Sequence, residues 1–236
     1  MKHIPLQPDL APPSLSRARK QGLDWETYSC SDDGHQLRQA KATEQQNFCG
    51  YCESRLTDDA GELSRGVSHI DHFFPQHKGS AQRPDLTFDW GNMVLSCMCS
   101  KTCGIYKDRQ KIPASGIIDP HNDDPRTFFT FVMEDNRYLS VQPMTTLDPQ
   151  RFKKAENTIE ALQLDVQKLR VDRYAALLVY KEEIDTLAGE FQHSVSNEFD
   201  TLRQLARELM DSLESEPFSS ALVAYATAEL KDFIEV

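Results

Sequence analysis

Helical periodicity dominates the last third of the chain. From Phe152 onward, apolar residues recur at spacings of three and four, which places them on one face of an amphipathic helix. A break at Glu216-Pro217 starts a last short helix. Two apolar stripes are present, the first made of Ile159, Leu162, Val166, Leu169, Ala176, Tyr180 and Leu187, and the second of Val195, Phe199, Leu202, Ala206, Leu209 and Leu213.

The pattern before Phe152 predicts shorter and mixed elements. A helix is expected from about Gly34 to Asn47, and two strands are expected to flank a loop over Pro75–Asp89. Farther on, Thr127–Met133 and Arg137–Val141 resemble the two strands of a hairpin. With the helical region, these elements predict an α+β fold.

Length and composition bound the organisation. A chain of 236 residues with 39% hydrophobic content can bury one good core and a second, smaller helical one. We expect an N-terminal arm or linker over residues 1–33, a main domain over 34–150 and an acidic helical region over 151–236. No apolar run approaches the roughly eighteen residues that a membrane span needs, so no membrane contact is expected.

The cysteines indicate a structural zinc site. Six cysteines occur in a chain that begins without an apolar export signal, so we expect a reducing, cytoplasmic location and metal binding rather than disulfides. Cys49-x-x-Cys52 is half of a zinc site. The other half comes from among Cys97, Cys99 and Cys103. We choose Cys97, where a strand ends, and Cys103, where a helix begins, with Cys99 as the alternate.

An acid-histidine pair lies between the cysteine pairs and suggests phosphodiester chemistry. His72, as a neutral imidazole, can take a proton from water and is the candidate general base. Asp71 is a hard oxygen ligand suited to a catalytic Mg²⁺ or Mn²⁺. Asn92, about twenty residues on, is expected to accept a hydrogen bond from one imidazole nitrogen and so fix the tautomer. These residue types predict a one-metal nuclease built around zinc.

The chain resembles the HNH endonuclease superfamily, the ββα-metal nucleases. Within that superfamily it resembles the PtuB-like nucleases of Septu and retron antiphage systems. The resemblance is specific from residue 48 to 108 and softer to about 175. It is carried by Phe48-Cys49-Gly50-Tyr51-Cys52-Glu53, by Ile70-Asp71-His72-Phe73 with Pro75, by Trp90-x-Asn92 with Leu95-Ser96-Cys97, and by Cys103-Gly104 before Lys107-Asp108.

The resemblance implies a zinc-stabilised ββα-metal fold and an antiviral nuclease toxin that works with an ATPase subunit of the PtuA type. In some such systems a retron reverse transcriptase and its branched DNA take part. One position departs from the family motif, which places His or Asn as a second metal ligand directly after the last cysteine. Here that position is Gly104, so Asp108, Ser100, His69 or water would have to complete the site.

Charge is distributed unevenly along the chain. The formal net charge is −11, yet residues 65–111 carry seven Lys or Arg against four Asp or Glu, whereas residues 190–236 carry three against ten. Basic residues of the first segment are therefore candidate phosphate contacts. The set chosen for nucleic-acid binding is Lys78, Arg83, Lys101, Lys107 and Arg109, and Arg65 and Lys111 belong to the same basic segment.

Two functions from different classes fit these patterns. The first is a metal-dependent HNH endonuclease that hydrolyses DNA or RNA. The second is a catalytically degenerate zinc-ribbon module that binds nucleic acid or serves as a scaffold. Both explain the cysteines, but only the endonuclease explains why Asp71, His72 and Asn92 occur together at motif spacing, so we favour it.

Overall fold

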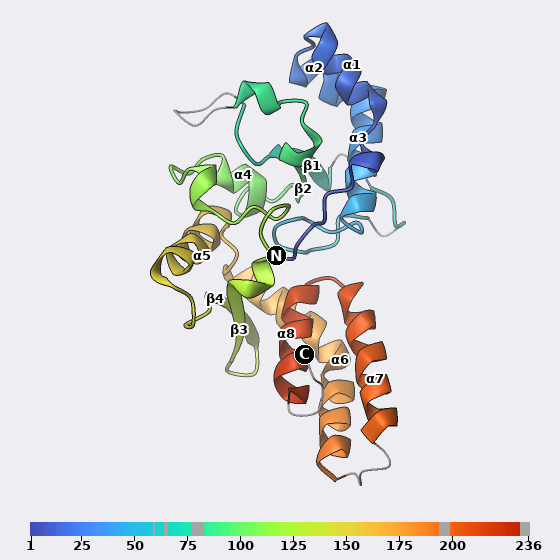
Figure 1. Cartoon of the computed structure of the whole chain (residues 1–236), viewed down its shortest axis with the longest axis vertical. Coiled ribbons are helices and arrows are strands. Elements are labelled where there is room, and N and C mark those ends of the chain that lie inside the picture. The colour runs from blue at the N-terminus through green and yellow to red at the C-terminus, as the bar shows by residue number, and fades with distance from the viewer. Residues whose placement is uncertain (59, 64–65, 77–82, 194–198, 232–236) are drawn as a thin grey trace.

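The computed structural model describes residues 1–58, 60–63, 66–76, 83–193 and 199–231, and Figure 1 shows its elements. It is a mixed α and β protein with two small antiparallel sheets. In Figure 1 the first helices lie at one end of the long axis and the last three helices at the other, with β1 and β2 between them and the β3–β4 hairpin beside α8. Short 3₁₀ turns lie at Pro8–Leu10, Pro84–Leu86, Trp90–Asn92, Ala114–Gly116 and Pro125–Thr127.

The N-terminal region is more ordered than an arm. Residues 13–30 form two helices, α1 (Pro13–Gln21) and α2 (Trp25–Cys30), where the sequence predicted an arm or linker over 1–33. That prediction was wrong because Met1 and Ile4 carry apolar side chains that are 5% and 3% exposed and join the main core. The proline-rich composition of the segment hid these anchors.

The third helix, α3 (Asp32–Glu44), is the one expected near residues 34–47. It starts two residues earlier because the Ser31 hydroxyl accepts a hydrogen bond from the Gly34 amide and caps its first turn. The capping of α2 by Asp24 follows the same rule, since its carboxylate accepts from the Thr27 amide. Both caps are short polar residues next to the helix start.

A ββα unit occupies the middle of the chain. Strand β1 (Ser68–His72) pairs antiparallel with β2 (Met93–Cys97), with Ser68 opposite Cys97 and His72 opposite Met93. Helix α4 (Cys103–Lys107) follows and packs on both strands. The predicted strands around the loop and the predicted helix at Cys103 are therefore present.

The second sheet is the predicted hairpin. Strands β3 (Phe129–Glu134) and β4 (Tyr138–Pro143) pair antiparallel, within two residues of the expected bounds. Asp135 and Asn136 lie between them with φ of 51° and 49°. Two consecutive left-handed residues form the tight turn whose twist suits a hairpin, and Asp and Asn tolerate that conformation better than most residues.

Four helices complete the chain. They are α5 (Pro149–Leu162), α6 (Gln167–His193), α7 (Phe199–Glu214) and α8 (Ser219–Leu230). The first apolar stripe was predicted as continuous, but it is divided between α5 and α6. Gln163 adopts a left-handed conformation with φ of 49° and ends α5, and Leu164 turns into the core at 2% exposure. Spacing alone did not reveal this break because both helices continue the same apolar period.

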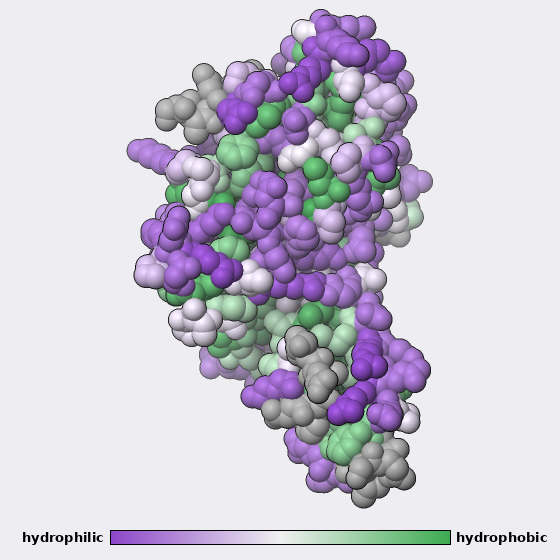
Figure 2. Space-filling model, in the orientation of Figure 1, coloured by the Kyte–Doolittle hydropathy of each residue, from purple (hydrophilic) through white to green (hydrophobic). Residues whose placement is uncertain are grey.

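Two large apolar clusters form the core. The first contains Cys49, Cys52 and Cys103 together with Leu162 and Phe218, so it joins the ββα unit to the helical region. The second lies among α6, α7 and α8. On the face shown in Figure 2, apolar side chains occur as patches between hydrophilic ones. Of the helices in the described ranges, none has the length and apolar character that crossing a bilayer requires.

Candidate metal centre and the Asp-His site

Four cysteines gather where the ββα unit meets the preceding loop. The sulfurs of Cys49, Cys52, Cys97 and Cys103 all lie within 4.8 Å of one another. A tetrahedral zinc site with Zn–S bonds near 2.3 Å places its sulfurs roughly 3.8 Å apart, so this donor set fits zinc after small adjustments. These are the four cysteines chosen from the sequence, and the alternate, Cys99, is not part of the group.

Backbone contacts hold the first cysteine pair against β2. The Gly50 amide donates to the Leu95 carbonyl at 3.0 Å, and the Cys97 amide donates to the Cys49 sulfur at 3.4 Å. Glu53, directly after the pair, adopts φ of 65° and closes the turn. The neighbouring thiols, Cys49 first, raise the pKa of Cys103 well above its usual value. A zinc ion would reverse this effect because its charge favours thiolates.

Asp71 lies at the end of β1 and is almost completely buried. Its side chain is 1% exposed and lies 3.3 Å from the Lys107 ammonium, and one oxygen, Oδ2, also accepts a hydrogen bond from the Tyr51 hydroxyl. Burial raises the pKa of Asp71, while the charge of Lys107 opposes that rise. Burial likewise raises the pKa of Tyr51 well above its usual value, with Asp71 adding to the effect.

Lys107 acts as a buried cation at this site. Its ammonium donates to the His72 carbonyl at 3.1 Å and to Asp108 Oδ1 at 2.9 Å, besides its contact with Asp71. Burial alone would lower the pKa of Lys107, but Asp71 and Asp108 raise it above its usual value. Lys107 was predicted to contact phosphate, and this structure contradicts that prediction because the ammonium is enclosed and saturated with acceptors.

Gly104 explains why no ligand side chain follows the last cysteine. A Cβ atom at this position would lie 2.7 Å from the Asp71 carboxylate, a distance that real contacts do not reach. The carboxylate thus fills the space that a His or Asn side chain would enter. The presence of glycine where the HNH motif has His or Asn is therefore a consequence of close packing between α4 and β1.

His72 is oriented by the loop after β1. Its Nε2 lies 2.9 Å from the Thr87 carbonyl, and a carbonyl only accepts, so Nε2 carries the proton. The Gln76 amide nitrogen lies 2.7 Å from Nδ1 and 2.9 Å from Nε2, and because Nε2 carries the proton, it donates to Nδ1. Nδ1 thereby has the lone pair of a base. His72 is 8% exposed. The Trp25 ring packs edge-on against its imidazole, with ring centroids 4.5 Å apart.

Asn92 plays a different part from the one predicted. It was expected to accept from the His72 imidazole, but its Oδ1 accepts from the Phe74 amide at 2.8 Å. Its Nδ2 donates to the carbonyls of Phe74 and Leu86 at 3.1 and 3.3 Å. Asn92 thus fixes the backbone of the loop, and the Thr87 carbonyl orients the ring. The distance in sequence between His72 and Asn92 indicated that Asn92 lies near the loop. It could not indicate whether the Asn92 side chain bonds to the imidazole or to the backbone.

The other predicted nucleic-acid contacts within the described residues are surface side chains. Arg83 is exposed and paired with Asp85 at 2.7 Å, and Lys101 and Arg109 are exposed near α4. Lys78 lies outside the described residues.

Sequence reasoning missed the roles of Tyr51 and Gln76. Tyr51 stands between the two cysteines of the first pair and Gln76 four residues after His72, and these positions are the signals that the sequence offered.

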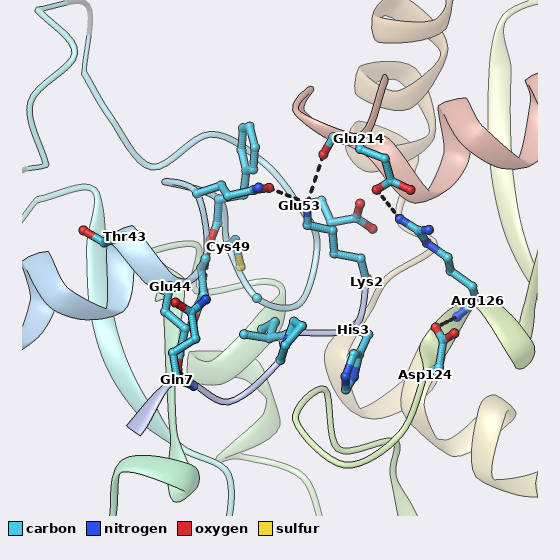
Figure 3. Close-up of a pocket in the computed structure, with 16 residues that line it drawn as sticks. Lys2, His3, Gln7, Thr43, Glu44, Cys49, Glu53, Asp124, Arg126 and Glu214 are labelled. Atoms are coloured by element: carbon cyan, nitrogen blue, oxygen red, sulfur yellow. Dashed lines mark hydrogen bonds and ion pairs between the residues drawn. The ribbon is translucent and has the colours of Figure 1, made fainter. Parts of the chain in front are cut away.

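A separate cavity lies on the other side of the first cysteine pair. Figure 3 shows this space of about 480 Å³, with Lys2 and Arg126 beside Glu53 and Glu214. Its charges are largely matched: Arg126 pairs with Glu214, and Lys2 donates to the Glu214 carbonyl at 3.0 Å. Neither Asp71 nor His72 lines it.

Two carboxylates at the Asp-His site share one cation. The Lys107 ammonium already takes the position of a cation between two carboxylates, Asp71 and Asp108. Carboxylate oxygens are preferred ligands of Mg²⁺ and Mn²⁺. A divalent ion would have to displace the ammonium, because the ammonium lies between the two carboxylates. Among the described residues, only the four cysteines form a group of three or more ligand atoms already gathered for a metal ion. No family model and no curated protein matches this chain.

Proposed function

We propose that this chain is an HNH-type endonuclease, a zinc-stabilised ββα unit that hydrolyses phosphodiester bonds with the help of Mg²⁺ or Mn²⁺. The observation that supports this most strongly is the pairing of β1 with β2 beside α4. It brings Asp71 against Tyr51 and Gly104, which neighbour the cysteines in sequence, places His72 after it on the same strand, and leaves His72 Nδ1 as an acceptor. Geometry of this kind suits proton transfer at a phosphate.

The residues of the chain divide the work. His72 Nδ1 accepts a proton from water as its oxygen attacks phosphorus, while the Thr87 carbonyl retains the proton on Nε2. The phosphorus–oxygen bond to the leaving sugar breaks, and that oxygen takes a proton from solvent. When bound beside Asp71, a divalent ion supplies charge stabilisation for the phosphoryl group. Gln76, which donates to Nδ1 in this structure, has to give way to the water.

A cleavage assay tests the proposal. Zinc-loaded full-length chain is incubated with plasmid, single-stranded DNA and total RNA in Mg²⁺ or Mn²⁺. His72→Ala should lower the cleavage rate at least about a hundredfold, the usual contribution of a general base, with zinc content unchanged. The control is His193→Ala, an exposed histidine at the end of α6. Equal rates for His72→Ala and the wild-type chain would refute the proposal.

A second candidate function has a specific observation in its favour. Asp71 and His72 are 3% and 8% exposed, and Asp71 is already neutralised by Lys107. A zinc-stabilised binding or scaffolding module would look the same. If the chain binds nucleic acid but no substrate is cut under any condition, with or without its partner, this second function replaces the first.

We also propose that the acidic helical region binds a partner, an ATPase subunit of the PtuA type, as the family resemblance implies. A groove of about 630 Å³ between α6 and α7 supports this, with Val179 and Leu205 exposed at 72% and 46%. Four glutamates border it: Glu182, Glu183, Glu190 and Glu208. A basic amphipathic helix suits such a surface. A retron reverse transcriptase with its DNA would be a further partner in an antiviral complex. The same proposal places the protein in the cytoplasm.

A further inference from the structure

The cation position at Asp71 has more donors around it than Asp71 alone. The Lys107 ammonium bridges Asp71 Oδ2 at 3.3 Å and Asp108 Oδ1 at 2.9 Å. Asp71 is buried, but the Asp108 side chain is 47% exposed and stands on the solvent side of the ammonium. One carboxylate is thus fixed in the fold, and the other can adjust to an ion that arrives from solvent.

His69 is the third donor. It lies two residues before Asp71 on β1, and alternate residues of a strand share one face. Its Nδ1 is buried without a hydrogen-bond partner in the described structure. Asp71, Asp108 and Lys107 are the charges that act on its ring. An unpaired buried polar atom is unfavourable, so its presence on the face of β1 that also carries Asp71 calls for an explanation.

We propose that His69, Asp71 and Asp108 form the binding site for the catalytic divalent ion, and that the Lys107 ammonium holds this position when no ion is bound. This inference rests on the proposed nuclease function. His69 and Asp108 supply the ligands that Gly104 cannot. Because an imidazole is a softer ligand than an oxygen and suits transition metals, the site takes Mn²⁺ in preference to Mg²⁺.

Direct measurement of Mn²⁺ binding tests the assignment. Zinc-loaded full-length chain is titrated with Mn²⁺, and free Mn²⁺ is followed by electron paramagnetic resonance. His69→Ala and Asp108→Asn should each weaken binding by at least about tenfold, since even loss of a residue that only orients a metal ligand costs about 10- to 100-fold. The spin-echo spectrum of bound Mn²⁺ should show coupling to a ligand nitrogen that disappears in His69→Ala.

Matched controls and zinc content separate binding from folding. His193→Ala and Asp135→Asn change exposed residues far along the chain, and asparagine tolerates the left-handed conformation of residue 135. Both should bind Mn²⁺ as the wild-type chain does. All variants are compared at equal zinc content and with cooperative unfolding.

The outcomes distinguish this inference from the nuclease proposal. If Asp71→Asn abolishes Mn²⁺ binding while His69→Ala and Asp108→Asn bind normally, the two residues are not ligands and the inference is overturned, although cleavage can still depend on His72. If the wild-type chain binds no Mn²⁺ at millimolar concentration, the inference also falls. The cleavage assay then decides the nuclease proposal independently.

Discussion

At the scale of single residues, the surroundings of Asp71 show what a motif does and does not reveal. The sequence identified Asp71 and His72 from their chemical types. It did not reveal that Tyr51 and Lys107 enclose Asp71, because burial depends on contacts between segments 20 and 36 residues away in sequence. A lysine is assigned to the surface by default, and Lys107 departs from that rule because two carboxylates compensate its charge.

Gly104 carries a prediction at this scale. Gly104→Ala should lower the free energy of unfolding by about 1–3 kcal/mol, because its Cβ would overlap the buried Asp71 carboxylate. Gly104→Asn, which restores the ligand type of the family motif, should be destabilised as well and should not bind Mn²⁺ more tightly. Urea unfolding of the zinc-loaded chain measures the first effect, and Mn²⁺ titration the second.

Gly189→Ala is the matched control for this prediction. Gly189 lies within α6, and a Cβ there would meet no atom within 4 Å. Alanine should therefore stabilise the helix by up to about 1 kcal/mol. If Gly104→Ala proves as stable as the wild-type chain, Asp71 has room that the structure does not show, and our explanation of the missing ligand fails.

At the scale of elements, local sequence predicted most of the helices and strands. The hairpin followed from alternation and turn residues, α3 from its periodicity, and α4 from its place after the cysteines. The elements that were missed depend on distant contacts. Helices α1 and α2 pack through Leu15 and Tyr28 against Trp90 and Met93 in one apolar cluster, and nothing in residues 13–30 alone indicated that partner.

The cysteine cluster carries a prediction at the scale of elements. Cys103 begins α4, and its sulfur joins that helix to the first cysteine pair. Cys103→Ser should abolish stable zinc binding and the cooperative unfolding of the ββα unit, since a small metal site contributes much of the folding free energy around it. Elemental analysis should find about one zinc per wild-type chain.

Cys99→Ser provides the comparison for this experiment. Cys99 is half-buried but lies outside the cluster, so its replacement should leave zinc content and unfolding unchanged. Loss of zinc from Cys99→Ser with retention in Cys103→Ser would show that the alternate cysteine is the true ligand. The two serine variants differ only in position, so a general effect of losing a thiol is controlled.

At the scale of the whole molecule, the helical region and the zinc site are physically joined. Arg173 of α6 is 4% exposed, and burial lowers its pKa while Glu53, Asp165 and the nearby cysteines oppose that change. Ser219 and Ser220 at the start of α8 both donate to Glu53, which follows the first cysteine pair. Removing the last helices would therefore disturb the cysteine cluster, so partner binding has to be tested by point substitutions.

The groove between α6 and α7 offers such a substitution. Leu205 of α7 lines the groove, whereas Leu178 of α6 lines a neighbouring hollow and not the groove, although both are about half exposed. Leu205→Gln should weaken binding to the proposed ATPase partner at least about tenfold, the equivalent of about 1.4 kcal/mol, because it removes an exposed apolar side chain from the lining of the groove. Leu178→Gln makes the same chemical change outside the groove and should bind normally. Dissociation constants from titration of each zinc-loaded variant with the purified subunit measure the difference. Equal affinities for the two variants would mean that the partner docks elsewhere, while binding weakened by salt would support the role of the acidic border.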